Sequence, residues 1–252
     1  MSQYEFKEVL LTPGEGARPG RKLINPIALV IHWTGNENKG ANAIANRNYF
    51  ENWRDHLNHL ASAHYIVDDH QVVRCIPEDE VAYQVGAQQY QPKAVKTFAG
   101  NPNNQVIGIE MCVNYDGDFN KTYKNTIELA ADILYRHGWG VDRLWRHYDV
   151  TGKTCPAYFV NDKKAKIFGY VNAAAGWDKF CLDVNIELRG RVEEVLAMFK
   201  DINGHWAKES VDRLANLGLI KGDGQGNFRP DQPITRAETV VLLDRLLKLL
   251  GK

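Results

Sequence analysis

Two histidines and one cysteine have the residue types of a metal site. His32 lies in the segment LVIHWTG, whereas His147 and Cys155 lie together in the segment RHYDVTGKTCP, where Gly152 can bend the chain between them. Two imidazoles and one thiolate bind Zn²⁺ in catalytic sites that leave the fourth coordination position to water. The set therefore predicts a zinc-dependent hydrolase with His32, His147 and Cys155 as metal ligands.

Glu110 and Lys153 are the candidate catalytic groups. Glu110 is the one charged residue in the apolar run VIGIEMCV, where a carboxylate is costly unless it is paired, bound to metal or functional. Burial should raise its pKa toward the range in which it exchanges protons. Lys153 stands two residues before Cys155, so in an extended segment its ammonium group would point the same way and stabilise an oxyanion. The alternatives are a structural glutamate bonded to the backbone and a solvated lysine.

The hydrophobic pattern predicts the framework that positions these residues. We expect buried strands at residues 28–31, ending at His32, and at 106–113, and a hairpin from residues 64–67 and 71–75. Residues 42–59 and 121–138 have apolar side chains at helical spacing, and Gly138 is a stop signal. Residues 144–146 are expected to form an extended segment that ends at His147. This alternation predicts an α/β fold with a mixed central β-sheet flanked by helices.

The chain is expected to divide into three parts. Residues 1–187 form the predicted catalytic domain, residues 188–200 a helical connector, and residues 201–252 a small C-terminal helical module. The module should contain a helix over residues 207–217, a glycine-rich turn at 222–226 and a second helix from about Arg236. The sequence contains no second copy of this segment upstream, so we predict a single module and not an array.

Charge and cysteine usage limit the possible partners and compartments. The formal net charge of +0 argues against a nucleic-acid partner. Glu5 and Glu8 interrupt the only apolar stretch near the N-terminus, so we expect synthesis in the cytoplasm without a signal peptide, and no run is long enough for membrane insertion. The cysteines have no closely spaced pairing, so we expect reduced thiols, with packing roles for Cys112 and Cys181. The remaining candidate histidines, His56, His59, His70 and His137, are expected to be structural or surface residues.

Four segments together resemble a known family. The segments LVIHWTG, SAHYIVDD, VIGIEM and HYDVTGKTCP are similar to those of the zinc-dependent N-acetylmuramoyl-L-alanine amidases of the type-2 family. The resemblance implies that His32, His147 and Cys155 bind zinc, and that Glu110 and Lys153 serve the attacking water and the tetrahedral intermediate. It implies bacterial peptidoglycan as the substrate, cut between N-acetylmuramic acid and L-alanine. Candidates for substrate contacts are Trp33, His64 and Gln84.

Two positions depart from the pattern of that family. Some phage members carry a catalytic tyrosine before the histidine of the second strand, whereas this chain has Ala63 before His64. The resemblance then implies that Glu110 takes the proton of the attacking water. Many members have a histidine where this chain has Gln84, whose side chain can form hydrogen bonds but cannot act as a base near neutral pH.

Residues 201–238 resemble one S-layer homology motif. Such motifs hold proteins on bacterial walls through secondary cell-wall polysaccharide, commonly three motifs together. The resemblance implies that Trp206 stacks on a sugar and that Arg236 clamps a carboxylate. In the alternative, Trp206 belongs to the core and Arg236 pairs with Glu238 or Asp231. Because this chain has one motif where three are usual, a homotrimer would restore the usual arrangement.

Two other functions stay open on the sequence. Part of the family binds peptidoglycan without cutting it, although those members typically lack the cysteine that stands here as Cys155. A metal-free cysteine hydrolase would use Cys155 as nucleophile and His147 as base. Wall cleavage after release from the cytoplasm fits a phage endolysin that lyses its host, and a bacterial autolysin is the other possibility.

Overall fold

The computed structural model describes residues 4–58, 60–196 and 199–249, so position 59 of the predicted helix and positions 197–198 of the predicted connector lie outside the described residues. The chain separates into two compact units, residues 1–187 and residues 188–252. None of the helices described has the length and apolar composition that a membrane crossing requires.

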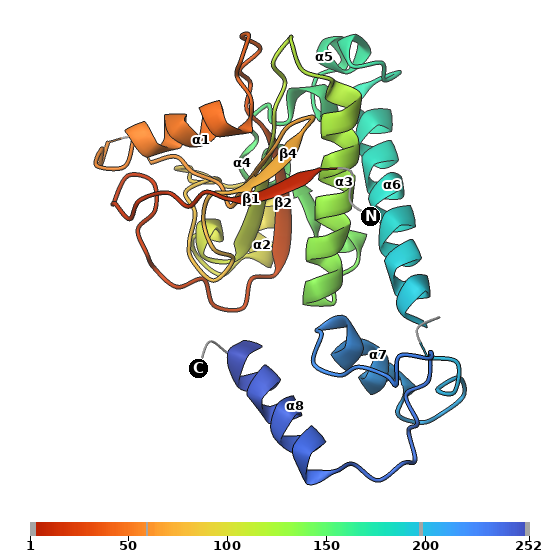
Figure 1. Cartoon of the computed structure of the whole chain (residues 1–252). Coiled ribbons are helices and arrows are strands. Elements are labelled where there is room, and N and C mark those ends of the chain that lie inside the picture. The colour runs from red at the N-terminus through yellow and green to blue at the C-terminus, as the bar shows by residue number, and fades with distance from the viewer. Residues whose placement is uncertain (1–3, 59, 197–198, 250–252) are drawn as a thin grey trace. The chain divides into compact units, whose positions relative to one another are not determined.

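A mixed six-stranded sheet forms the centre of the first unit (Figure 1). The order of its strands is β1 (Glu5–Glu8), β4 (Gln71–Arg74), β3 (Tyr65–Val67), β5 (Val106–Met111), β2 (Ala28–Trp33) and β6 (Leu144–Arg146). Only β3 and β4 pair antiparallel, as the predicted hairpin requires, and the other neighbours are parallel. The predicted α/β class and mixed sheet are confirmed. The edge strand β1 was not predicted, because its sequence EFKE has only one apolar residue.

Helices cover both faces of the sheet. The longer helices α3 (Phe119–His137) and α6 (Ala173–Leu196) lie on one side, and α1 (Ala43–Asn52), α2 (Pro92–Thr97) and α4 (His147–Thr151) lie on the other (Figure 1). Val30 of β2 and Val106 of β5 pack with residues of α2 and α4. Since side chains alternate along a strand, His32 and Glu110 point to this same face. The remaining short elements of the unit are α5 (Asp162–Ile167) and the 3-10 turns Pro102–Asn104, Val141–Arg143 and Ala157–Phe159.

Two of the predicted helices have different bounds from those expected. The helix predicted at residues 42–59 ends at Asn52, because the Arg54 carbonyl accepts a hydrogen bond of 2.7 Å from the Gly16 backbone and the chain turns there. Residues 188–196 of the predicted connector belong to a helix that already begins at Ala173, buries Phe180 and ends at Leu196. The helix predicted at 121–138 is confirmed as α3, which ends at Gly138 in the left-handed conformation.

The second unit contains α7 (Lys208–Asn216) and α8 (Arg236–Leu249), which confirm the two predicted helices. Its small core consists of Phe199, Ile202, Val211 and Ala215. The Asp201 carboxylate fastens the connecting loop, since it accepts hydrogen bonds from the backbone of Phe228 and Arg229 at 2.8 and 2.7 Å. Trp206 is 90% exposed, which contradicts the alternative that it belongs to the core.

Candidate metal centre and active-site cleft

Parallel strand pairing brings the two histidines together. His32 is the second-to-last residue of β2, and His147 directly follows the neighbouring strand β6 as the first residue of α4. Gly152 then ends α4 with a positive φ of 80°, and the Tyr148 backbone donates to the Cys155 carbonyl at 3.0 Å. This turn returns Cys155 to the position of the two imidazoles.

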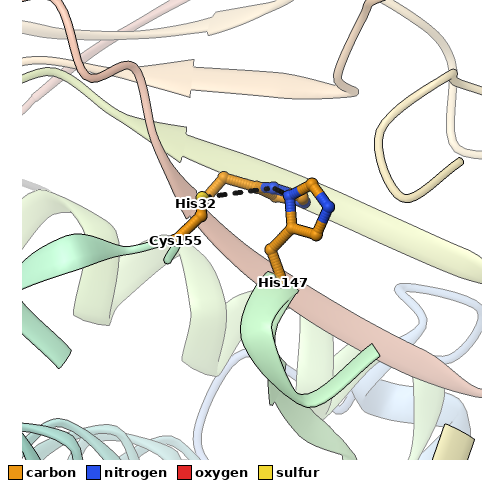
Figure 2. A group of neighbouring side chains, drawn as sticks. All are labelled: His32, His147 and Cys155. Carbon is orange, nitrogen blue, oxygen red and sulfur yellow. Dashed lines mark hydrogen bonds between the residues drawn. The ribbon is translucent and has the colours of Figure 1, made fainter. Parts of the chain in front are cut away.

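The three predicted ligands converge on one point (Figure 2). Their ligand atoms all lie within 4.8 Å of one another. The Nδ1 atoms of His32 and His147 are 3.0 Å apart, and the Cys155 Sγ is 3.8 Å from the His32 Nδ1. Tetrahedral zinc with ordinary bond lengths needs edges of roughly 3.3 Å between nitrogens and about 3.6 Å between nitrogen and sulfur. The donor set and its spacing therefore fit one zinc ion.

Burial sets the protonation of these ligands. It lowers the pKa of His32 well below its ordinary value, and it lowers the pKa of His147 to about 3, with Lys153 acting in the same direction. Both imidazoles are therefore neutral near pH 7, which is the form that binds a metal. Burial and the nearby Glu110 raise the pKa of the Cys155 thiol, so a bound cation is needed to favour its thiolate.

Glu110 faces the metal centre with an unsatisfied oxygen. It stands opposite His32 in the register of β5 against β2. Its Oε2 atom is buried and has no hydrogen-bond partner among the described residues. Burial raises the pKa of Glu110 to about 8, against the opposing effect of Lys153. A carboxyl group in this range can both accept and donate a proton near neutral pH.

The site opens into a cleft of about 990 Å³. Its lining includes the catalytic candidates Glu110 and Lys153, the ligands His147 and Cys155, and Trp33. Lys153 is exposed at the rim of this cleft. Other parts of the lining are formed by Tyr49, Phe50, Leu60, Asn101 and Asn103. The cleft is therefore large enough for a substrate that extends well beyond the metal centre.

Two predicted substrate contacts, His64 and Gln84, have protein partners in the structure. His64 is fully buried, its Nε2 donates to the Glu80 carbonyl at 2.9 Å, and its Nδ1 accepts from the Gly108 backbone at 3.1 Å. Gln84 lines the cleft, but both ends of its amide bind protein groups: the Oε1 meets the His32 Nε2 at 3.2 Å and the Nε2 donates to the Val106 carbonyl at 3.1 Å. The structure thus gives both side chains protein partners.

Thr34 is a candidate that sequence reasoning missed. Its Oγ1 atom is buried without a hydrogen-bond partner among the described residues, and the residue lines the cleft. The Thr34 backbone continues the pairing with β5, since it donates to the Met111 carbonyl at 2.9 Å. Counting two residues on from His32 along the strand would have found it, because such residues share a face.

The predicted wall-binding residues lie in the second unit. Trp206 and Arg236 are both exposed. Glu238 accepts from Thr235, and Asp231 lies 3.3 Å from His205, so the carboxylates proposed as alternative partners of Arg236 are engaged elsewhere.

The first unit thus combines a mixed sheet, a converging His-His-Cys set that could hold a metal ion, and a facing carboxylate. A family model described as N-acetylmuramoyl-L-alanine amidase matches residues 23–158, and the chain belongs to this family. The family resemblance seen in the sequence is thereby confirmed. A model of the S-layer homology domain matches residues 199–240.

Individual relatives agree with this assignment. A probable N-acetylmuramoyl-L-alanine amidase of Bacillus licheniformis is 42% identical over 146 residues, covering 58% of this chain and 40% of that protein. The amidase CwlA of Bacillus subtilis strain 168 is 32% identical over 236 residues, covering 92% of this chain and 75% of that protein. The solved catalytic domain of XlyA superposes with a TM-score of 0.55 and 25% identity, covering 71% of this chain and 99% of that domain. The chain spans 40% of the length of this Bacillus licheniformis amidase and likewise 40% of the length of the amidase CwlL from the same species.

Proposed function

We propose that this chain is a zinc-dependent peptidoglycan hydrolase that cuts the amide bond between N-acetylmuramic acid and L-alanine. One observation carries the proposal: the three ligand atoms of His32, His147 and Cys155 converge beside the buried, unpartnered Glu110 Oε2. Membership of the amidase family supports the choice of bond and substrate.

His32, His147 and Cys155 would hold the zinc ion. Bound there, zinc would supply Lewis acidity toward the scissile carbonyl and make water nucleophilic near neutral pH. Glu110 takes the proton of the attacking water at its carboxylate and passes a proton to the departing amine of L-alanine. The Lys153 ammonium group lies at the rim of the cleft, where it stabilises the negative charge that develops on the carbonyl oxygen.

Purified cell walls provide the direct test. The wild-type chain should release new amino termini, and Glu110→Gln and Cys155→Ala should reduce this release by at least about a hundredfold while keeping the circular dichroism of the fold. Cys75→Ala is the matched control, because Cys75 is a buried free cysteine outside the cleft. Full activity of either site variant would remove the mechanism. Binding to walls without release of amino termini by the wild type would favour the non-catalytic alternative.

The metal-free cysteine mechanism receives no support from the geometry. A nucleophilic cysteine needs a lowered pKa, whereas burial raises the pKa of the Cys155 thiol. A chelator separates the two mechanisms, since the zinc enzyme loses activity and regains it with added zinc. Activity that is unaffected by a strong chelator would revive the cysteine mechanism.

For the second unit we propose attachment to the wall through secondary cell-wall polysaccharide, in a homotrimer. The S-layer homology match supports wall targeting. Exposed Trp206 and Arg236 supply a stacking surface and a cation for an anionic sugar. The helix α8 exposes Val240, Leu243 and Leu247, an apolar face that a second copy of the unit can cover. Sedimentation of the full chain tests the trimer, which a monomer at all concentrations would exclude. Action on the wall after release from the cytoplasm stays a prediction.

A further inference from the structure

The orientation of the Gln84 side chain is fixed by a backbone group. Its Nε2 lies 3.1 Å from the Val106 carbonyl, and a carbonyl oxygen can only accept a hydrogen bond. The NH₂ end of the amide must therefore face Val106. The opposite end, the Oε1 atom, then faces the His32 Nε2 at 3.2 Å.

This orientation determines where His32 carries its proton. Because the Gln84 Oε1 can only accept, the His32 Nε2 must be the protonated ring nitrogen. A neutral imidazole then has its free lone pair at Nδ1. That atom is the one that faces the His147 Nδ1 at 3.0 Å and the Cys155 Sγ at 3.8 Å.

The surrounding residues hold Gln84 in place. The backbone N–H groups of Gln84 and Val85 both donate to the Asn103 Oδ1, at 3.0 and 2.9 Å. Gly108 on β5 leaves room for the amide, since a Cβ atom added there would lie 1.4 Å from the Gln84 Oε1. The Gly108 N–H in turn donates to the buried His64, so the glycine and the histidine together shape the space around the amide.

We propose that Gln84 is a positioning residue that fixes His32 in the Nε2–H tautomer and so presents its Nδ1 to zinc. Gly108 is required to make space for the amide, and His64 completes its surroundings. This inference rests on the proposed zinc site, and it assigns to Gln84 a role different from the predicted substrate contact. Partners that fix the second nitrogen of a histidine ligand typically change metal affinity by about 10- to 100-fold when they are removed.

Zinc affinity of the full chain, measured by competition with a chromophoric chelator, tests this role without reference to activity. Gln84→Leu should bind zinc about 10- to 100-fold more weakly. Gln71→Leu is the matched control, because Gln71 is a buried glutamine of β4 that does not line the cleft, and its zinc affinity should not change.

The tautomer itself is measured by ¹⁵N NMR of the His32 side chain in the metal-free protein. The wild type should carry the proton at Nε2, and Gln84→Leu should show a mixture of the two tautomers. Unchanged zinc affinity in Gln84→Leu or a wild-type proton at Nδ1 would overturn the proposal. If the wild type binds no zinc, the proposed function fails, but the NMR measurement on the wild type still decides the tautomer. That measurement does not depend on the folding of any variant.

Discussion

Glu110 lies directly opposite His32 in the pairing of β5 with β2, so a carboxylate and a candidate zinc ligand face the same side of the sheet. Parallel strands fix this relationship through their backbone hydrogen bonds and not through a flexible loop. The carboxylate is held near the metal centre even though nothing in the described residues pairs with its Oε2 atom. The fold itself therefore keeps a costly, unpaired group at the place where the proposed chemistry needs it.

The first prediction concerns stability against pH in the metal-free protein. Burial raises the pKa of Glu110 from 4.5 to about 8, so its contribution to stability is fully present below pH 4.5 and is lost as the pH rises to about 8. Glu110→Gln removes this dependence and should gain stability relative to the wild type across that range. Urea unfolding in the presence of a chelator measures the free energy of unfolding of both proteins at each pH. Burial lowers the pKa values of His32 and His147, so these two residues make the free energy of unfolding rise with pH below 6.5. Both histidines are present in the two proteins, so their contribution cancels in the comparison. A difference between the two proteins that stays constant with pH would contradict the raised pKa.

The second prediction concerns zinc and thermal unfolding. Zinc should raise the unfolding temperature of the wild type and of Cys75→Ala, because an ion that binds only the folded state stabilises it, by about 2.7 kcal/mol at a hundredfold excess over Kd. Cys155→Ala should show a much smaller rise, since it lacks the sulfur ligand. Differential scanning fluorimetry with chelator and with zinc gives the comparison. Equal rises in both cysteine variants would show that zinc binds elsewhere.

The third prediction separates Lys153 from metal binding. Lys153→Ala should lower kcat by about a hundredfold or more, because a charge that stabilises the oxyanion is lost, with little change in KM. Lys153→Arg should recover part of the rate. Zinc affinity should not fall in either variant, since Lys153 is not a ligand. Steady-state kinetics on a soluble muropeptide measures these values, with Lys166→Ala, an exposed lysine of α5, as control. A loss confined to KM would assign Lys153 to substrate binding alone.

The fourth prediction uses two glycines at which an added methyl group meets no neighbour within 4 Å. Gly138 ends α3 with a φ of 67°, so Gly138→Ala should lower the free energy of unfolding by about 1 kcal/mol. Gly190 lies inside α6, so Gly190→Ala should raise helix stability by up to about 1 kcal/mol. Chemical denaturation checks both values, and activity should be unchanged. Effects of the same sign would show that backbone conformation is not the cause.

The fifth prediction concerns the second unit. Trp206→Ala should weaken binding of the full chain to purified walls several-fold and leave the unfolding temperature unchanged, because the indole is 90% exposed. Phe199→Ala is the contrasting variant, since it removes a buried side chain of the small core and should lower stability. Co-sedimentation with walls, with and without secondary polysaccharide, measures the binding. Wall binding that is equal in the wild type and Trp206→Ala would remove Trp206 from the binding surface.

The convergence of the two histidines and the cysteine could be predicted from the sequence because these residue types are distinctive and because strand ends are easy to locate. His32 closes an apolar run, and His147 and Cys155 share one short segment. The same reasoning did not predict the contact of Gln84 with His32, which is 52 residues away along the chain. A glutamine near a cleft can bind either a substrate or another protein group. Only the positions of Val106 and His32 in the folded chain show its protein partners.

Helix ends and surface exposure could not be predicted from the sequence either. The apolar spacing at residues 42–59 continues past Asn52, but a carbonyl that bonds to the loop at Gly16 ends the helix. The long helix α6 was recognised only near its end, because the alanine-rich segment at its start gives no amphipathic pattern of its own. For Trp206, a small unit needs an apolar anchor, and the sequence could not show that Phe199 fills this place instead.

The pairing of β6 with β2 is only three residue pairs long, and His147 follows it at once. A slip of this short strand by a single position would turn the His147 ring to the wrong face and leave His32 without its counterpart. If the proposed zinc ion binds there, its retention would report that this short strand is correctly aligned, because a misaligned chain would have only one of the two imidazoles in place to hold it.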